Sequence, residues 1–329
     1  EAVEICKLRL FLKMAAVVEP DPQKPNYGLE PLPDIDFNIR DGNTLVGFVS
    51  ADEVRGVTAD SKPEQISMFV EDSSGEQLTL LPNIKESRVY KDIIEELELV
   101  ERIYDLFRRQ QLELGGEVTA GHKRNLRDQL NKLTDKLNIY LAKLYNIDQV
   151  REQEKFQQWL ETHKPFHWFA EFYGIMKRGG FDVIIGNPPY VEYSPQKVGY
   201  FIKDYATTTC RNLYAFILER NTKLSTDKTR SGMIVPHSAF CTDRMGPLMD
   251  LFRNNYSIWV STYDIRPAKL FNGVDQRLAI YITSQNDRKE TYSTKYFRWH
   301  ENARPHLFAL LKYNRATKIS YENSLAKLG

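Results

Sequence analysis

The stretch that decides the fold runs from Phe181 to Tyr190 and has the sequence Phe-Asp-Val-Ile-Ile-Gly-Asn-Pro-Pro-Tyr. Its first six residues form an apolar run that predicts a buried β-strand. The Pro188-Pro189 pair then fixes backbone φ angles and removes two N–H donors, so the neighbouring carbonyls are held outside any helix and are available to a ligand. The strand is therefore predicted to end at a rigid turn that carries Asn187 and Tyr190.

The groups on this turn suit the recognition of an aromatic heterocycle that carries an amino group. The side-chain carbonyl of Asn187 can accept a hydrogen bond from such an amino group, and the ring of Tyr190 can stack on the heterocycle. An enzyme that modifies an extruded nucleic-acid base needs both contacts. The simpler alternative, for a Pro-Pro pair taken alone, is a stiff turn without a ligand.

The surrounding residues favour the first interpretation. The Asn-Pro-Pro-Tyr motif after an apolar strand resembles motif IV of the S-adenosylmethionine-dependent amino-methyltransferases. With Phe166–Phe169 (Phe-His-Trp-Phe) and Arg178–Asp182 (Arg-Gly-Gly-Phe-Asp), it is similar to the large adenine-N6 DNA methyltransferases of type IIG restriction-modification enzymes and phage-defence systems. The resemblance implies a Rossmann-like α/β fold, S-adenosylmethionine as cofactor and double-stranded DNA as partner.

The cofactor-binding half of such enzymes is only partly represented. In the family, a Gly-rich turn holds the methionine part of the cofactor and a carboxylate holds its ribose, and we find neither here. Glu1–Leu10 resembles the helix that follows that carboxylate, and it begins without a capping residue. We therefore expect a fragment that is inactive and binds S-adenosylmethionine weakly on its own. Asp41–Leu45 resembles motif III, which implies that Asn43 contacts the adenine amino group of the cofactor; the alternative is an ordinary Asn-containing turn.

A second aromatic residue is implied by the resemblance. Leu270–Ile280 is similar to motif VIII, whose aromatic side chain packs on the flipped adenine opposite the tyrosine, so Phe271 is the expected second stacking residue. The alternative is a core aromatic before a strand. Asn212–Phe216 and Gly232–Ser238 resemble motifs V and VI, and His237 is expected to be a loop or core histidine and not a base.

The mechanism that the family implies uses the motif itself. Asn187 and the Pro188 carbonyl would accept the two N6 hydrogens of adenine, which favours a pyramidal nitrogen with its lone pair directed at the methyl group. Pro189 stiffens the turn, Tyr190 stacks on the base, and no separate general base is required.

Three scattered cysteines without a Cys-x-x-Cys pattern predict neither a disulfide framework nor a zinc site.

Three regions are predicted along the 329 residues. Residues 1–50 are the remnant of the cofactor-binding half, with a helix over Glu1–Met14 and a strand at Ile35–Arg40. Residues 51–160 are an insertion with a β-hairpin at Ser67–Leu81 and an antiparallel helical hairpin. Residues 161–329 are the catalytic half.

The helical hairpin and the sheet are predicted from hydrophobic periodicity. Apolar residues spaced by three and four indicate the two helices: Ile93, Leu97, Val100, Tyr104 and Phe107, then Leu126, Leu130, Leu133, Leu137, Leu141 and Leu144. The expected strands are Phe181–Gly186, Ser231–Pro236, Ile258–Ile265, Arg277–Thr283 and Tyr292–Trp299, and a helix includes Leu213–Arg220. The charged outer face of the hairpin is expected to be solvated, with a DNA-contacting arm as the alternative.

Charge and composition bound the partners. The net charge is +1, but residues 261–329 contain twelve Lys or Arg against six Asp or Glu, so this part is basic enough to follow phosphates. A solvated surface of mixed sign is the alternative. There is no long apolar run and no signal-like N-terminus, so we expect a cytoplasmic protein without a membrane partner. A target-recognition domain is expected C-terminal to these residues.

Two other functions remain open at this point. An enzyme with the same tetrapeptide could methylate RNA or a protein glutamine, although such enzymes are generally compact and lack the helical insertion. Alternatively, the chain could be a catalytically silent scaffold or DNA-contacting module.

Overall fold

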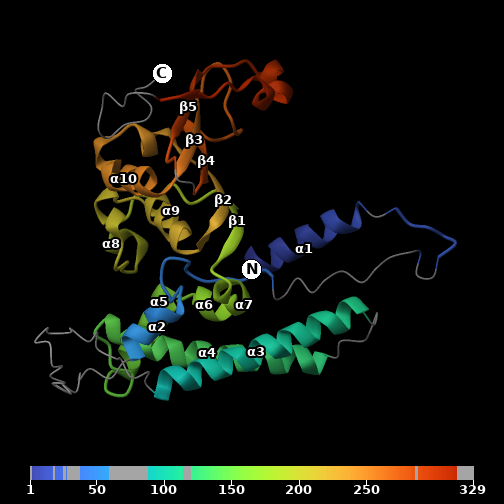
Figure 1. Ribbon diagram of the computed structural model, residues 1–329, viewed down its shortest axis with the longest axis vertical. Coiled ribbons are helices and arrows are strands. Elements are labelled where there is room, and N and C mark those ends of the chain that lie inside the picture. The colour runs from blue at the N-terminus through green and yellow to red at the C-terminus, as the bar shows by residue number, and fades with distance from the viewer. Residues whose placement is uncertain are drawn as a thin grey trace, which may run out of the picture. The chain divides into compact units, whose positions relative to one another are not determined.

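The computed structural model describes residues 2–17, 19–24, 27, 38–58, 88–113, 120–285 and 288–316. The chain divides into two compact units, Glu1–Gly174 and Ile175–Gly329 (Figure 1). The expected β-hairpin at Ser67–Leu81 and residues 35–37 of the expected strand at Ile35–Arg40 lie outside the described residues, and Asn38–Arg40 are not in a strand.

The first unit is helical. Its helices are α1 (Ala2–Ala15), α2 (Ala51–Thr58), α3 (Arg88–Glu113), α4 (Ala120–Leu144), α5 (Gln153–His163) and α6 (Trp168–Glu171), and α7 (Tyr173–Lys177) runs into the second unit. Helix α1 confirms the expected N-terminal helix. Its apolar side chains, however, are not buried: Leu8 and Leu12 are 58% and 56% exposed.

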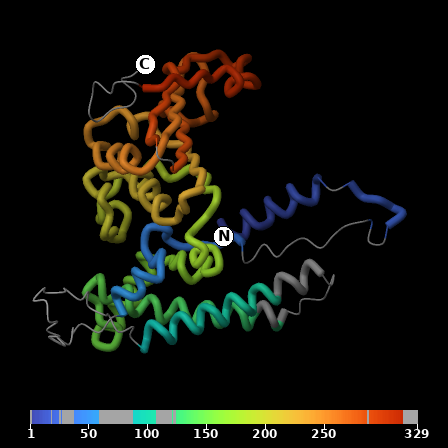
Figure 2. Tube along the Cα trace, viewed as in Figure 1, coloured from blue at the N-terminus to red at the C-terminus, as the bar shows by residue number. Residues whose placement is uncertain are grey.

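Helices α3 and α4 form the predicted antiparallel hairpin and lie side by side in Figure 2. The pairing runs in opposite directions along the two helices, because Glu96 is bonded to Lys136 while Val100, further along α3, packs with the earlier Leu126 of α4. The predicted apolar faces are confirmed, since these side chains are buried: Ile93, Leu97, Val100, Leu126, Leu130, Leu133, Leu137 and Leu141. Tyr104 is half-buried, the side chain of Phe107 lies outside the described residues, and Leu144, the last residue of α4, is 41% exposed.

A second contact in the first unit joins the segment around Asn43 to the segment around Phe166. The backbone N–H of Asn43 donates to the Lys164 carbonyl at 2.8 Å, and that of Phe166 donates to the Val46 carbonyl at 2.7 Å. The two backbones approach so closely that a Cβ atom at Gly47 would lie 2.0 Å from the Phe166 carbonyl oxygen, and Gly47 has a φ of +141°. Only glycine is tolerated in such a position.

The side chain of His167 stabilises this contact. Its side chain is 1% exposed; Nδ1 accepts the Phe48 backbone N–H at 3.2 Å, and the other nitrogen, Nε2, lies 3.0 Å from Asn138 Oδ1 on α4. The first contact requires Nδ1 to be unprotonated, so Nε2 carries the hydrogen and donates it to the amide oxygen. Burial lowers the pKa of His167 to about 3, so the imidazole is neutral at physiological pH.

The buried imidazole makes stability depend on pH. The pKa of His167 is about 3 in the folded chain, against an ordinary value of 6.5. As the pH falls, the imidazole is therefore protonated in the unfolded chain while it is still neutral in the folded chain. This lowers the unfolding free energy by about 1.4 kcal/mol per pH unit below roughly pH 6. His167→Gln removes this contribution, so the difference in unfolding free energy between wild type and variant should shrink from pH 7 to pH 5. Urea unfolding at each pH measures it. The exposed His306→Gln is the control, and a constant wild-type-to-His167→Gln difference would contradict the assignment.

The second unit contains a six-stranded mixed sheet. The strands are β1 (Phe181–Gly186), β2 (Ser225–Pro236), β3 (Ser257–Tyr263), β4 (Leu278–Ser284), β5 (Thr291–Phe297) and β6 (Asn314–Arg315), in the order β1-β2-β4-β3-β5-β6. The β1–β2 and β3–β5 pairs are parallel, and the other pairs are antiparallel. Its helices are α8 (Pro195–Val198), α9 (Leu213–Lys223) and α10 (Gly246–Asn255), with 3-10 turns at Ala206–Cys210, His237–Phe240, Asp243–Met245, Glu301–His306 and Phe308–Leu310.

The predicted Rossmann-like α/β class is confirmed, and the chain contains the predicted helical hairpin. Strand β1, helix α9 and strand β2 form a βαβ unit, in which parallel strands are joined through a helix. Strand β1 has the expected bounds, and β3, β4 and β5 begin one residue from the expected starts. Strand β2 begins at Ser225 instead of Ser231, and its register with β1 shifts between Phe181 and Val183.

Two hydrophobic clusters pack on the sheet. The larger cluster joins α9 and α10 to β2, β3 and β4, and its members include Tyr214, Leu218, Val235, Leu248, Phe252, Val260 and Tyr281. The smaller cluster consists of Tyr263, Ala268, Leu270, Leu278, Trp299 and Leu307. It lies where β3 ends and β4 begins, and it forms the base of the candidate site described below.

The expected burial of β1 is wrong. Val183 and Ile185 are 63% and 79% exposed, whereas Ile184, which points the other way, packs against the larger cluster. The reason is that Val183 and Ile185 project from one face of the sheet and Ile184 from the other, and only the Ile184 face is covered. An apolar run in a sequence indicates a strand but does not say how many of its faces are covered.

Candidate active site

The Asn-Pro-Pro-Tyr motif lies at the carboxyl end of β1, the end at which parallel α/β sheets bind their ligands. Asn187 and Pro189 are exposed, Pro188 is buried and Tyr190 is half-buried. The chain beyond the motif is fixed to the start of α9, because the Val191 carbonyl accepts the backbone N–H of Leu213 at 3.0 Å. The turn is thus anchored on both sides and presents the Asn187 side chain to solvent.

The hydroxyl of Tyr190 is bonded to the side chain of Asn187. It lies 2.6 Å from Asn187 Oδ1 and 3.2 Å from the Ile234 carbonyl oxygen on β2, and its single hydrogen is shared between these acceptors. Burial raises the pKa of Tyr190, so the phenol keeps its proton at neutral pH and remains the donor. The bond orients the amide and occupies one acceptor position of Oδ1. The sequence interpretation missed this contact, although the three-residue spacing permits it.

Phe271 lies beside the same hydrophobic cluster as Tyr190. The ring of Tyr190 and the side chain of Val274 pack against the cluster formed by Tyr263, Leu270 and their neighbours. Phe271 follows Leu270 directly, its carbonyl accepts the Val274 N–H at 3.3 Å, and its own side chain is 38% exposed. The structure therefore brings the segments of Asn187, Tyr190 and Phe271 together in the second unit, and Phe271 is not a fully buried core aromatic.

Asn43 belongs to the first unit. Its Oδ1 accepts the backbone N–H of Leu45 at 3.1 Å, and its carbonyl accepts the N–H of Val46 at 3.0 Å, so it forms an Asx turn. The side chain is half-buried. The residue is thus a turn former, and the Leu45 N–H uses only one of the two lone pairs of its amide oxygen.

His237 begins the turn after β2. It is half-buried, and its Nδ1 lies 3.3 Å from Cys241 Sγ. Burial lowers its pKa, and the charge of Arg277 lowers it further, so the ring is neutral at physiological pH. These observations agree with the expected loop histidine.

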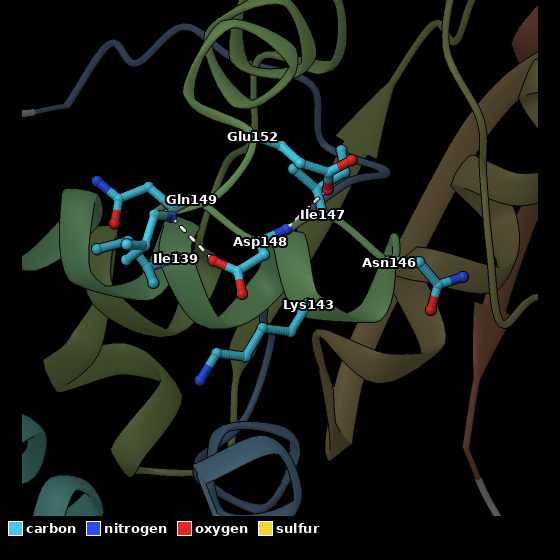
Figure 3. A pocket seen from close by; sticks show the side chains of 8 residues that line it. Ile139, Lys143, Asn146, Ile147, Asp148, Gln149 and Glu152 are labelled. Atoms are coloured by element: carbon cyan, nitrogen blue, oxygen red, sulfur yellow. Dashed lines mark hydrogen bonds between the residues drawn. The ribbon is translucent and has the colours of Figure 1, made fainter.

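Other ligand sites are sparse in the described part of the chain. No three His, Cys, Asp or Glu side chains within it converge in a way that could hold a metal ion. A cleft of about 500 Å³ lies in the first unit, at the end of α4, and is lined by Ile139, Lys143, Asn146, Ile147, Asp148, Gln149, Val150 and Glu152 (Figure 3). None of the predicted site residues lines it. Within the same residues, no helix is both long and apolar enough to cross a membrane.

The exposure of Phe271 predicts its contribution to stability. Leu270→Ala removes a side chain that is 9% exposed and packs in the smaller cluster, so it should cost about 2 kcal/mol or more of unfolding free energy. Phe271→Ala should cost less than about 1 kcal/mol, because the ring is partly in solvent. Urea unfolding of both variants compares them. Equal losses would identify Phe271 as a packing residue.

Solved structures of restriction-modification enzymes resemble parts of the chain. A nuclease-deletion mutant of the type ISP restriction-modification enzyme LlaGI, in complex with a DNA substrate mimic, aligns with 69% of this chain and 27% of its own, at 11% identity and a TM-score of 0.38. The methyltransferase subunit of a type I restriction-modification system from Streptococcus thermophilus aligns with 35% of this chain and 26% of its own, at 22% identity and a TM-score of 0.27.

The sequence comparisons are more informative. A protein of Methanocaldococcus jannaschii, named as a type II restriction enzyme and methyltransferase, is 27% identical over 261 residues, which are 72% of this chain and 21% of that protein. The chain thus spans about a fifth of the length of this relative. The model of the Eco57I restriction-modification methylase family matches residues 1–271. Because this match includes most of the sequence and the Asn-Pro-Pro-Tyr motif, the chain belongs to the Eco57I restriction-modification methylase family.

Proposed function

We propose that the protein transfers a methyl group from S-adenosylmethionine to the N6 amino group of an adenine extruded from double-stranded DNA. The observation that carries the proposal is the anchored Asn187 side chain at the carboxyl end of β1, with Tyr190 bonded to its oxygen. Membership in a restriction-modification methylase family supports methyl transfer. Adenine as the base, and a type IIG enzyme with a separate target-recognition domain, remain part of the proposal.

The chemistry required of the protein follows from the substrate. The N6 lone pair of adenine is delocalised into the ring, so the amino group is a poor nucleophile. Two acceptors placed on its hydrogens, Asn187 Oδ1 and the Pro188 carbonyl, would localise the lone pair and fix the amino group in position. The rigid turn supplies these acceptors without reorganisation, which is the main source of rate enhancement in such a site.

The Tyr190 hydroxyl has a defined part in this scheme. Without substrate it donates to Asn187 Oδ1 and to the Ile234 carbonyl. When an adenine amino group enters, it would take the second lone pair of Oδ1, or replace the hydroxyl, which keeps the Ile234 carbonyl as its acceptor. The phenol can thus hold the amide in one orientation before binding and leave no unpaired buried group after it.

The extruded base also needs two apolar faces. Tyr190 and the partly exposed Phe271 would supply them; Tyr190 packs against the smaller hydrophobic cluster, and Phe271 follows Leu270, a member of that cluster. Stacking on aromatic side chains contributes roughly 1 to 3 kcal/mol per base, which is comparable to the few kcal/mol lost on unstacking from the duplex.

S-adenosylmethionine supplies an electrophilic methyl group on sulfur. Asn43 is the described residue that suits part of this cofactor, because its half-buried Oδ1 keeps one acceptor position for an adenine amino group. We propose this contact as its role.

The central test is Asn187→Ala in the full-length protein. The exposed side chain contributes little to packing, so the thermal midpoint should stay within a few degrees of wild type, while methyl incorporation into duplex DNA should fall at least 100-fold. Tritiated methyl transfer to DNA, RNA and protein is measured in parallel. Normal DNA methylation by the variant, or transfer to RNA or protein only, would refute the proposal.

The stacking role is tested by two substitutions at Tyr190. Tyr190→Phe keeps the ring, whereas Tyr190→Ala removes it, so only the Ala variant should lose most of its affinity for the extruded base. A duplex with 2-aminopurine at the target position reports extrusion by its fluorescence. Equal signals from the two variants would contradict stacking by this ring.

A further inference from the structure

Three charged residues lie at the ends of strands in the second unit. Asp264 directly follows β3, Arg277 directly precedes β4, and Arg298 directly follows β5. Arg277 Nε lies 3.3 Å from Asp264 Oδ1, and Arg298 Nε lies 3.0 Å from Asp264 Oδ2. The Ile265 backbone N–H also donates to Asp264 Oδ1, at 2.8 Å. One carboxylate therefore holds two guanidinium groups.

The cluster carries a net positive charge. Burial alone would raise the pKa of Asp264, but the Ile265 amide, the Arg277 guanidinium, the Tyr296 hydroxyl and the Arg298 guanidinium outweigh it and lower the pKa below its ordinary value. The cluster thus has one negative and two positive charges at neutral pH. The Asp264 side chain is only 5% exposed, whereas those of Arg277 and Arg298 are 59% and 72% exposed.

The arginines are held by one nitrogen each. Both use Nε for Asp264, and among the described residues their terminal nitrogens make no further hydrogen bond or ion pair. Exposed ion pairs contribute little to stability. Asp264 limits the rotamers of the two long arginine side chains and holds both guanidinium groups at the same exposed place.

The cluster lies at the same end of the sheet as the candidate site. The Arg277 carbonyl accepts the backbone N–H of His237, which follows β2, at 2.8 Å. Tyr190 bonds to Ile234 near the end of β2, and β4 is the next strand after β2 in the sheet. Since neighbouring strands are about 4.8 Å apart, Arg277 is placed about 10 Å from the line of β1, which carries Asn187.

We propose that Arg277 and Arg298 bind backbone phosphates of the DNA strand that carries the target adenine. This inference rests on the proposed function. An extruded nucleotide stays linked to its neighbours, so phosphates must pass the rim of the base site. Guanidinium groups match the geometry of phosphate oxygens, and such contacts position a duplex without reading its sequence. Because Asp264 fixes both side chains beforehand, less conformational entropy is lost on binding.

The test is the salt dependence of DNA affinity of the full-length protein. Each phosphate contact contributes about 0.9 to the slope of log K against log salt concentration. Arg277→Gln and Arg298→Gln should each lower that slope by about 1, and the double variant by about 2. Arg230→Gln is the matched control. This exposed arginine lies in the middle of β2 and pairs with Ser284, the last residue of β4, so it is far from Arg277 at the other end of β4 and should leave the slope unchanged. Unchanged slopes in the Arg277 and Arg298 variants would refute the proposal.

A second measurement places the contacts. In the modified duplex, neutral methylphosphonates replace the phosphates on either side of the target adenine. The wild-type protein should bind this duplex several-fold more weakly than the natural one. The double variant should bind both duplexes with equal affinity. An equal loss for both proteins would refute contact at these phosphates. If the slopes change as expected but Asn187→Ala methylates DNA normally, the phosphate contact stands and the proposed catalytic role of Asn187 fails. If the slopes stay unchanged but Asn187→Ala loses DNA methylation, the catalytic role stands and the phosphate contact fails.

Discussion

The parallel pairing of β1 with β2 determines where the candidate reactive groups lie. Gly186 is paired with Met233, so the chain leaves β1 beside the last residues of β2. This register brings the Tyr190 hydroxyl to the Ile234 carbonyl and fixes the amide of Asn187 at the same time. A shift of the register by one residue would move the side chains of β1 to the other face of the sheet and displace Tyr190 from the Ile234 carbonyl. The geometry of the motif is therefore a property of the pair of strands and not of the tetrapeptide alone.

The first unit uses a buried neutral histidine for a comparable purpose. His167 joins the segment of Asn43 to helix α4 through the Phe48 amide and the Asn138 side chain. The helical hairpin is thus connected by hydrogen bonds to the turn that carries Asn43. The hairpin insertion, whose function the sequence does not indicate, has at least this structural part in supporting the turn.

The sequence predicted local features well and pairings poorly. Strand β1 could be placed to the residue, because its apolar run lies between a glycine pair and a proline pair. The hairpin followed from heptad-like spacing. The exposure of Val183 and Ile185 could not be predicted, because it depends on which elements pack on that face of β1. Asp264 was expected inside a strand, and its contacts with Arg277 and Arg298 join residues 13 and 34 positions apart. No local pattern reports such contacts.

The site residues show the same division. Asn187 and Tyr190 were found from the motif, whereas the bond between them depends on the turn geometry that the prolines impose. Phe271 was identified by resemblance, and its partial exposure distinguishes it from the neighbouring Leu270. Asn43 was expected to contact a ligand, and the structure adds that one lone pair of its oxygen is already used.

The exposed edge of β1 has a consequence for the behaviour of the chain in solution. Its six residues include one exposed charged residue, Asp182, but neither lysine nor proline, which natural proteins use to prevent edge strands from pairing. Its outer backbone groups can form hydrogen bonds with an extended segment of another chain, and the exposed side chains of Val183 and Ile185 would add apolar contacts. Among the described residues, strand β1 therefore offers a second chain a place to pair with the sheet, directly before the candidate active site.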